Sequence, residues 1–195
     1  MKHTRLALAL ALALVPALAH AHPGHGGETG GIVWGLAHPF SGLDHLLAMI
    51  AVGLWAVQIG KRALWLLPLS FVSAATLGAA LGMGGVRLPL VEPAILASVI
   101  ALGALIAFAR RLPLGVSAAI VFAAALFHGQ AHGSEIPATA SGFQAISGFI
   151  IATAILHTIG VAGGLTLRRS GRCGAIRVAG AAILSAAVLM SLGVI

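Results

Sequence analysis

The sequence predicts an all-α membrane protein, a polytopic bundle of about six transmembrane helices with both termini outside. The 195-residue chain is 59% hydrophobic and only 8% charged, and its mean hydropathy is +1.07. Soluble domains carry about 25% charged residues. The apolar residues also gather in stretches close to the ~20 residues that cross a bilayer. Most basic residues fall between those stretches, as topology signals do.

The first element is a predicted cleaved signal peptide, residues 1–21. Two basic residues precede a short apolar stretch, which is followed by small residues that allow cleavage after Ala19 or Ala21. Cleavage after Ala19 would make His22 the third residue of the mature chain. A free amine, two amides and a third-position histidine can bind Ni(II) or Cu(II) in a square plane.

Residues 22–41 form a His-rich segment that we expect outside the membrane. His22, His25 and Glu28 lie among glycines in its first part. The segment is either a flexible linker or a collector of metal ions. The remaining residues, 42–195, form the predicted transmembrane permease domain.

Six apolar stretches of this domain are the predicted spans, and the basic residues orient them. The stretches are 42–60, 63–82, 93–109, 112–131, 141–167 and 178–195. If they alternate in direction, one side receives eight basic residues: Lys61, Arg62, Arg110, Arg111, Arg168, Arg169, Arg172 and Arg177. The other side receives only Arg87, so the positive-inside rule places both termini outside. A signal peptide independently requires an outer N-terminus. The lone Cys173 allows no internal disulfide.

This orientation places every carboxylate, and most histidines, on the outer side. The four acids are Glu28, Asp44, Glu92 and Glu135, and the six outer histidines of the mature chain are His22, His25, His38, His45, His128 and His132. A vestibule rich in carboxylate and imidazole would attract a divalent cation. The charge pattern does not indicate a nucleic-acid partner, because the basic residues form no patch with interleaved aromatic residues.

The first polar motif, "HPFSGLDH", occupies residues 38–45. Ser41 and Asp44 have the spacing of a capping box, which would be a purely structural role. His38 and His45 are seven residues apart and would share a face of a continuous helix. Asp44 lies beside that face, where it could orient His45.

The second polar motif, "FHGQAHGSE", occupies residues 127–135. His128, His132 and Glu135 have i, i+4 and i+7 spacing, so they share a face if the segment is helical. Two imidazoles and a carboxylate within nine residues indicate a metal site. The two glycines that follow these histidines could instead unwind this end of the helix.

His157 is a third candidate, because polar groups inside a membrane are usually functional. It lies ten residues before the predicted inner end of its span, or about 15 Å from that end at 1.5 Å per residue. This places it near the middle of the membrane. Thr153, one turn earlier, is its expected hydrogen-bond partner.

The two motifs resemble the signatures HPxxGxDH and FHGxAHGxE of the HupE/UreJ family, and every fixed position matches. The signal peptide, His-rich start and six-span layout match as well. The family is regarded as secondary nickel, or in some members cobalt, permeases linked to hydrogenase and urease maturation. The resemblance implies that the functional positions are His38, Asp44, His45, His128, His132 and Glu135.

We therefore expect a permease of the bacterial inner membrane that imports Ni²⁺, with Co²⁺ as the second choice. It would be no enzyme, hold no tightly bound cofactor, and have lipid and hydrogenase or urease maturation proteins as partners. No phosphate-binding glycine loop indicates direct use of ATP. One alternative is a haem-binding redox protein, since histidines on facing helices can be axial ligands. The other is a membrane metal-binding accessory protein that does not transport.

Overall fold

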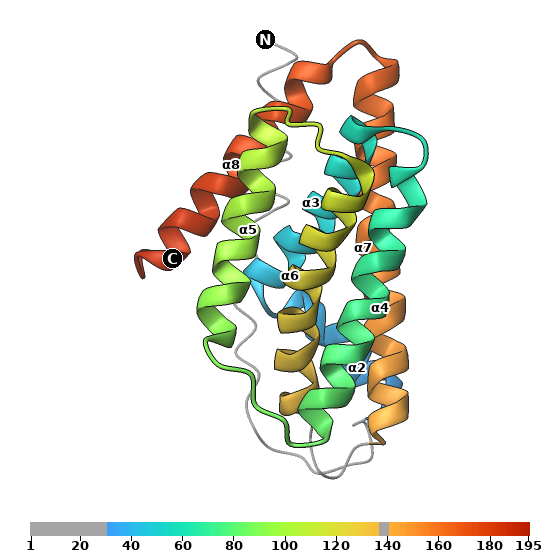
Figure 1. Ribbon diagram of the computed structural model, residues 1–195, viewed down its shortest axis with the longest axis vertical. Coiled ribbons are helices and arrows are strands. Elements are labelled where there is room, and N and C mark those ends of the chain that lie inside the picture. Colours follow the sequence, from blue (N-terminus) through green and yellow to red (C-terminus); the bar gives the residue numbers. More distant parts are fainter. Residues whose placement is uncertain (1–30, 137–140) are drawn as a thin grey trace.

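The computed structural model describes residues 31–136 and 141–195, and every regular element in these two ranges is helical (Figure 1). The predicted signal peptide, His22 and His25 lie outside the described residues. The elements are α2 (Ile32–Ala37), the 3₁₀ helix η1 (His38–Phe40), α3 (Leu43–Ile59), α4 (Ala63–Met83), α5 (Val91–Ala107), α6 (Leu114–Glu135), α7 (Gly142–Arg169) and α8 (Cys173–Ser191).

The long helices α3 to α8 coincide with the six predicted apolar stretches and form a helical membrane bundle. Four of them, α4, α6, α7 and α8, are long and apolar enough to cross a membrane individually. The bent pair formed by α2–η1 and α3 makes a fifth candidate if it is one span. Helix α5 has 17 residues, or about 26 Å against a hydrocarbon thickness of about 30 Å. Six complete crossings therefore remain a prediction.

The chain turns sharply before α3, where the axes of α2–η1 and α3 form an angle of 85°. Pro39 lies in η1, and Gly42 is the extended residue that precedes α3. Proline lacks the N–H that a continuous helix requires, so the break falls where the sequence permits it. Helix α2 packs against α7, so the bundle includes residues that sequence reasoning assigned to the N-terminal segment.

Two helix ends extend beyond the predicted apolar stretches. Helix α6 stays helical through Gly129 and Gly133 to Glu135, because these glycines pack against α4 and do not unwind. Helix α8 begins at Cys173, five residues before the predicted start. Its first turns carry Arg177, whose Nε donates a 3.0 Å hydrogen bond to the carbonyl of Ala107. A long arginine side chain can reach such a partner from within an apolar helix.

Close backbone contacts between glycines and neighbouring helices hold the bundle together. A Cβ on Gly133 would meet the backbone carbonyl of Ala79, and one on Gly82 would lie 2.6 Å from that of Gln130. Because each helix presents glycines to the other, α4 and α6 touch along their backbones. Three more pairs show the same reciprocity: Gly35 with Gly148 (α2 and α7), Gly53 with Gly160 (α3 and α7), and Gly103 with Gly180 (α5 and α8).

The two ends of the bundle differ in charge. We call the end where α3, α5 and α7 terminate and α4, α6 and α8 begin the basic end, because it carries the eight basic residues named above. Side chains tie these termini together: Trp55 Nε1 donates to the Arg110 carbonyl at 3.0 Å and Arg168 Nη1 to that of Val57 at 3.1 Å. The opposite end, which we call the histidine end, carries Asp44, Glu92 and Glu135.

Candidate metal site

Four histidines from three helical elements meet at the histidine end. η1 supplies His38, α3 supplies His45, and α6 supplies His128 and His132. The ring centroid of His132 lies 4.7 Å from that of His38 and 4.3 Å from that of His45. The rings of His45 and His128 are 4.6 Å apart. The structure thus joins the two predicted motifs into one continuous cluster of imidazoles.

The outer part of the cluster consists of His38, His132 and Glu135. Their potential ligand atoms all lie within 4.8 Å of one another. Nε2 of His38 is 2.7 Å from Oε2 of Glu135, which is exposed at the helix end. The i, i+3 spacing on α6 brings His132 and Glu135 to one face, as the sequence predicted. The bend before α3 brings His38 to that face although the helix is not continuous.

Asp44 is a partner of His45 and does not act in a capping box. Oδ1 of Asp44 accepts hydrogen bonds from Nδ1 of His45 at 2.8 Å and from its backbone N–H at 2.7 Å. The hydroxyl of Ser41 instead donates to the His38 carbonyl at 2.6 Å, and α3 has no side-chain cap. Gly42 occupies the N-cap position, so Ser41 is one residue too early. The carboxylate fixes the tautomer in which Nε2 of His45 carries the lone pair.

The inner part of the cluster also has free lone pairs. Ser98 donates its hydroxyl to the Ile95 carbonyl at 2.7 Å, so the 3.0 Å contact between its oxygen and Nε2 of His128 requires that nitrogen to donate. Nδ1 of fully buried His128 is then an acceptor without a partner in the described part of the chain. Nε2 of His45 and both ring nitrogens of His132 are also buried without a partner there. Buried polar atoms normally have partners, so this concentration of unpaired ring nitrogens makes the cluster a candidate ligand site.

A pocket of about 200 Å³ gives access to this cluster. Besides residues of both motifs it is lined by Glu92, from the first turn of α5. Sequence reasoning placed Glu92 on the outer side but omitted it from the site. The scarcity of acids in the chain could have identified it, since Glu92 is one of only four.

His157 lies apart from the cluster, on α7. Its ring and that of His128 both contact Phe71, with centroid distances of 4.9 Å and 5.8 Å. Phe71 is fully buried, so an apolar ring separates the two imidazoles. Within residues 31–136 and 141–195, both ring nitrogens of His157 lack partners, and so does the Thr153 hydroxyl. The predicted hydrogen bond between Thr153 and His157 is therefore absent.

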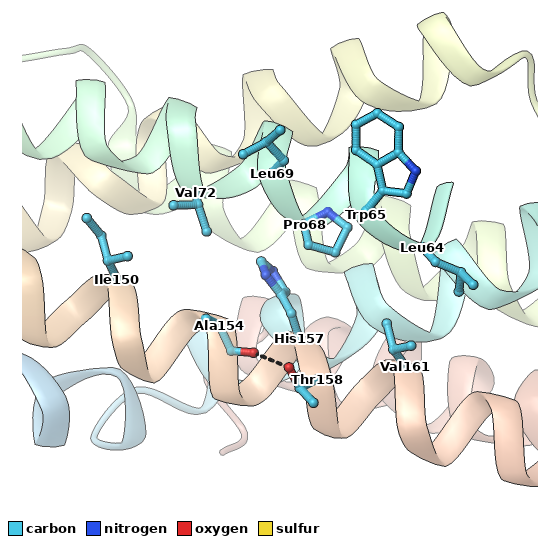
Figure 2. A pocket seen from close by; sticks show the side chains of 10 residues that line it. All are labelled: Leu64, Trp65, Pro68, Leu69, Val72, Ile150, Ala154, His157, Thr158 and Val161. Carbon is cyan, nitrogen blue, oxygen red and sulfur yellow. Dashed lines mark hydrogen bonds between the residues drawn. The ribbon is translucent and has the colours of Figure 1, made fainter. Parts of the chain in front are cut away.

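His157 faces a groove between α4 and α7. Figure 2 shows its imidazole directed toward α4, near Pro68 and Val72. The groove encloses about 490 Å³ and its lining is almost entirely apolar. None of the described residues that line this groove is a carboxylate, in contrast to the cluster at the histidine end.

Comparison with known proteins identifies the family of the chain. The profile of the family described as "HupE / UreJ protein" matches residues 10–190. The chain is 43% identical over 195 residues to Protein HupE of Rhizobium leguminosarum bv. viciae, covering 99% of this chain and 100% of that protein. No solved structure gives a significant match. The chain therefore belongs to the HupE/UreJ family, whose members act in nickel or cobalt transport or as accessory proteins of metal handling.

Proposed function

We propose that this protein is a permease that carries a divalent transition metal, Ni²⁺ first and Co²⁺ second, into the cell. The observation that carries the proposal is the imidazole cluster, in which three neighbouring histidines have buried ring nitrogens without a hydrogen-bond partner in the part of the chain that the structure describes. Neutral imidazole is a good ligand for divalent nickel and its neighbours in the transition series. The carboxylates of Asp44 and Glu135 would balance part of the charge of the ion.

The cluster contains two overlapping sets of ligands. His38, Glu135 and His132 form the outer set, and His45 and His128 form the inner set, whose nearest outer neighbour is His132. A shared ligand lets an ion move inward by exchanging one ligand at a time, so that it is never fully stripped of donors. His157, beyond Phe71, is the proposed next stop on the path toward the basic end.

The membrane potential is a sufficient driving force in this scheme. An inside-negative potential favours import of a doubly charged ion by about 4.6 kcal/mol per 100 mV. His22 and His25 would gather metal ahead of the cluster, since sequence places them outside the spans. In this role the protein lies in the bacterial inner membrane and supplies maturation proteins of hydrogenase or urease.

The geometry argues against the haem alternative. The pocket of about 200 Å³ is smaller than the ~300–1,000 Å³ of sites that enclose cofactor-sized ligands. The imidazoles also contact one another at centroid distances of 4.3–4.7 Å, which leaves no space for a macrocycle between them. A purified protein without a Soret band would agree with this argument.

The decisive experiment is uptake into proteoliposomes under an inside-negative potassium diffusion potential, with Ni²⁺, Co²⁺ and Zn²⁺ compared. We expect uptake that saturates and that collapses when the potential is abolished. The matched control is the His132→Ala variant, which removes the shared ligand. Binding of Ni²⁺ by the detergent-solubilised protein without any uptake would identify the accessory alternative and refute transport.

A further inference from the structure

We propose that the basic end contains a binding site for the phosphate of an anionic phospholipid. A pocket of about 100 Å³ opens there, between the end of α3, the α5–α6 connection, the end of α7 and the start of α8. Arg111, Arg168 and Arg177 line it, together with Cys173. The site is remote from the histidine cluster, and the inference does not depend on which metal the protein handles.

Two of the arginines are held in place by the protein. Nε of Arg177 donates to the Ala107 carbonyl at 3.0 Å, and Nη1 of Arg168 donates to the Val57 carbonyl at 3.1 Å. The other N–H groups of each anchored guanidinium have no hydrogen-bond partner among the described residues. Those of Arg177 form the two-pronged edge that suits a phosphate. Because the anchoring bonds already restrict the side chains, an anion that binds here orders them further at little entropic cost.

The pocket lacks an internal counter-ion. Among the described residues, the carboxylates of Asp44, Glu92 and Glu135 belong to the histidine end. The first turn of α8 carries no acid, and its N-cap residue Arg172 makes no side-chain cap. The free N–H groups of this helix start add a positive partial charge beside the three guanidinium groups. No carboxylate of the described residues therefore balances these guanidinium groups, and an anionic ligand would supply that charge.

Exposed apolar side chains favour a lipid over a free anion. Phe108 is 64% exposed and Val178 is 69% exposed, and they adjoin the two residues, Ala107 and Arg177, that make the anchoring bond. A ligand with an anionic head and an acyl chain would satisfy the arginines and cover these side chains together. Basic pockets between transmembrane helices on the cytoplasmic side bind lipid head groups in this way.

The test uses Cys173 as a built-in probe, because it is the only cysteine in the chain and it is exposed in the pocket. The rate of its alkylation by the uncharged reagent N-ethylmaleimide is measured in mixed micelles of phosphatidylcholine with or without phosphatidylglycerol, or with inorganic phosphate. Native mass spectrometry counts the retained lipids in the same samples. We expect phosphatidylglycerol to slow alkylation and to be retained at one molecule per protein.

Two triple variants that lose the same charge distinguish binding at a specific site from general attraction to a positively charged surface. Arg111→Gln, Arg168→Gln and Arg177→Gln together remove the pocket's guanidinium groups. Arg62→Gln, Arg169→Gln and Arg172→Gln together remove three arginines of the same end that do not line it. The pocket variant should lose phosphatidylglycerol affinity by at least about tenfold, and the control should change far less.

Three outcomes would overturn the proposal. Equal losses in the two triple variants would show only diffuse attraction. Equal protection by phosphatidylcholine would show that no anion is required, and protection by inorganic phosphate alone would indicate a soluble ligand. The alkylation measurement on the unmodified protein tests the site before any variant is made, so a variant that fails to fold leaves that test standing.

Discussion

Oδ1 of Asp44 lies 2.8 Å from Nδ1 of His45, and the same oxygen accepts the backbone N–H of His45. The adjacent residues thus form one rigid unit at the start of α3. A carboxylate in this position holds the imidazole so that its other nitrogen faces the cluster, and it strengthens that nitrogen as a ligand. The following predictions begin with this pair.

Asp44→Asn should lower the initial rate of Ni²⁺ uptake by about tenfold or more at unchanged protein abundance. Asparagine can still accept the hydrogen bonds, so the variant isolates the negative charge. Uptake of radioactive Ni²⁺ into cells, normalised to the membrane-extracted protein, measures the effect. Ser41→Ala is the control, because it removes an uncharged polar group of the same pocket whose one hydrogen bond among the described residues is to the His38 carbonyl. Normal uptake by Asp44→Asn would reduce Asp44 to a structural residue.

His132→Ala should weaken Ni²⁺ binding more than either His38→Ala or His128→Ala. The reason is position: its ring lies beside both His38 and His45, so its removal damages both ligand sets. Isothermal titration calorimetry of the detergent-solubilised proteins compares the three dissociation constants. If the three variants bind equally well, the cluster does not share a ligand as proposed.

His157→Phe should separate binding from movement of the ion. The substituted ring can still pack against Phe71, but both unpaired nitrogens are lost. We expect unchanged Ni²⁺ affinity at the histidine end and an uptake rate reduced several-fold. Calorimetry and proteoliposome uptake on one preparation give the two values. Full uptake would exclude His157 from the path.

Gly133→Ala should destabilise the bundle by about 1–3 kcal/mol, as overpacking does, and should also impair uptake. The added Cβ would meet the backbone of Ala79 and push α6 away from α4, which displaces His132. Gly163→Ala is the matched control, since nothing lies within 4 Å of its Cβ position and alanine favours a helix by about 0.5–1 kcal/mol. A thermal shift assay should show a fall for the first variant and none for the second.

Reporter fusions test the orientation. A periplasm-dependent reporter fused after Ile195 should be active, and the same reporter inserted after Arg169 should be inactive, because the eight basic residues predict an inner location for the basic end. Activity with the opposite pattern would invert the assignment of every histidine. Inactivity at both sites would indicate an odd number of crossings.

Much of this arrangement was predictable because a membrane-spanning helix requires a long apolar stretch of sequence. Apolar stretches give the long helices, and the few polar residues among them are conspicuous, which is how both motifs of the cluster were found. The face shared by His128, His132 and Glu135 follows from helical spacing alone. The contact between His38 and Glu135 does not, since the residues are 97 positions apart.

The interpretations that failed concern residues whose interaction partner is not determined by the local sequence. Spacing allowed Ser41 to cap a helix, but the position of the first helical residue decides this, and α3 starts one residue too late. Thr153 was a reasonable partner for His157, yet its hydroxyl and both imidazole nitrogens have no hydrogen-bond partner among the described residues, so a spacing of one turn did not bring them together. Glycines were ambiguous for the same reason: only the packing partner decides whether Gly129 and Gly133 unwind a helix or join two helices.

The glycine contacts have a mechanical consequence. Helices whose backbones touch have no layer of side chains that can rearrange between them, so α4 with α6 forms one stiff body and α2 with α3 and α7 forms another. The first body carries His128, His132 and Glu135, and the second carries η1 and α3 with His38, Asp44 and His45. Each half of the cluster thus belongs to a different body. A small rocking of one body against the other would bring together or separate all the cross-cluster ligands in a single movement.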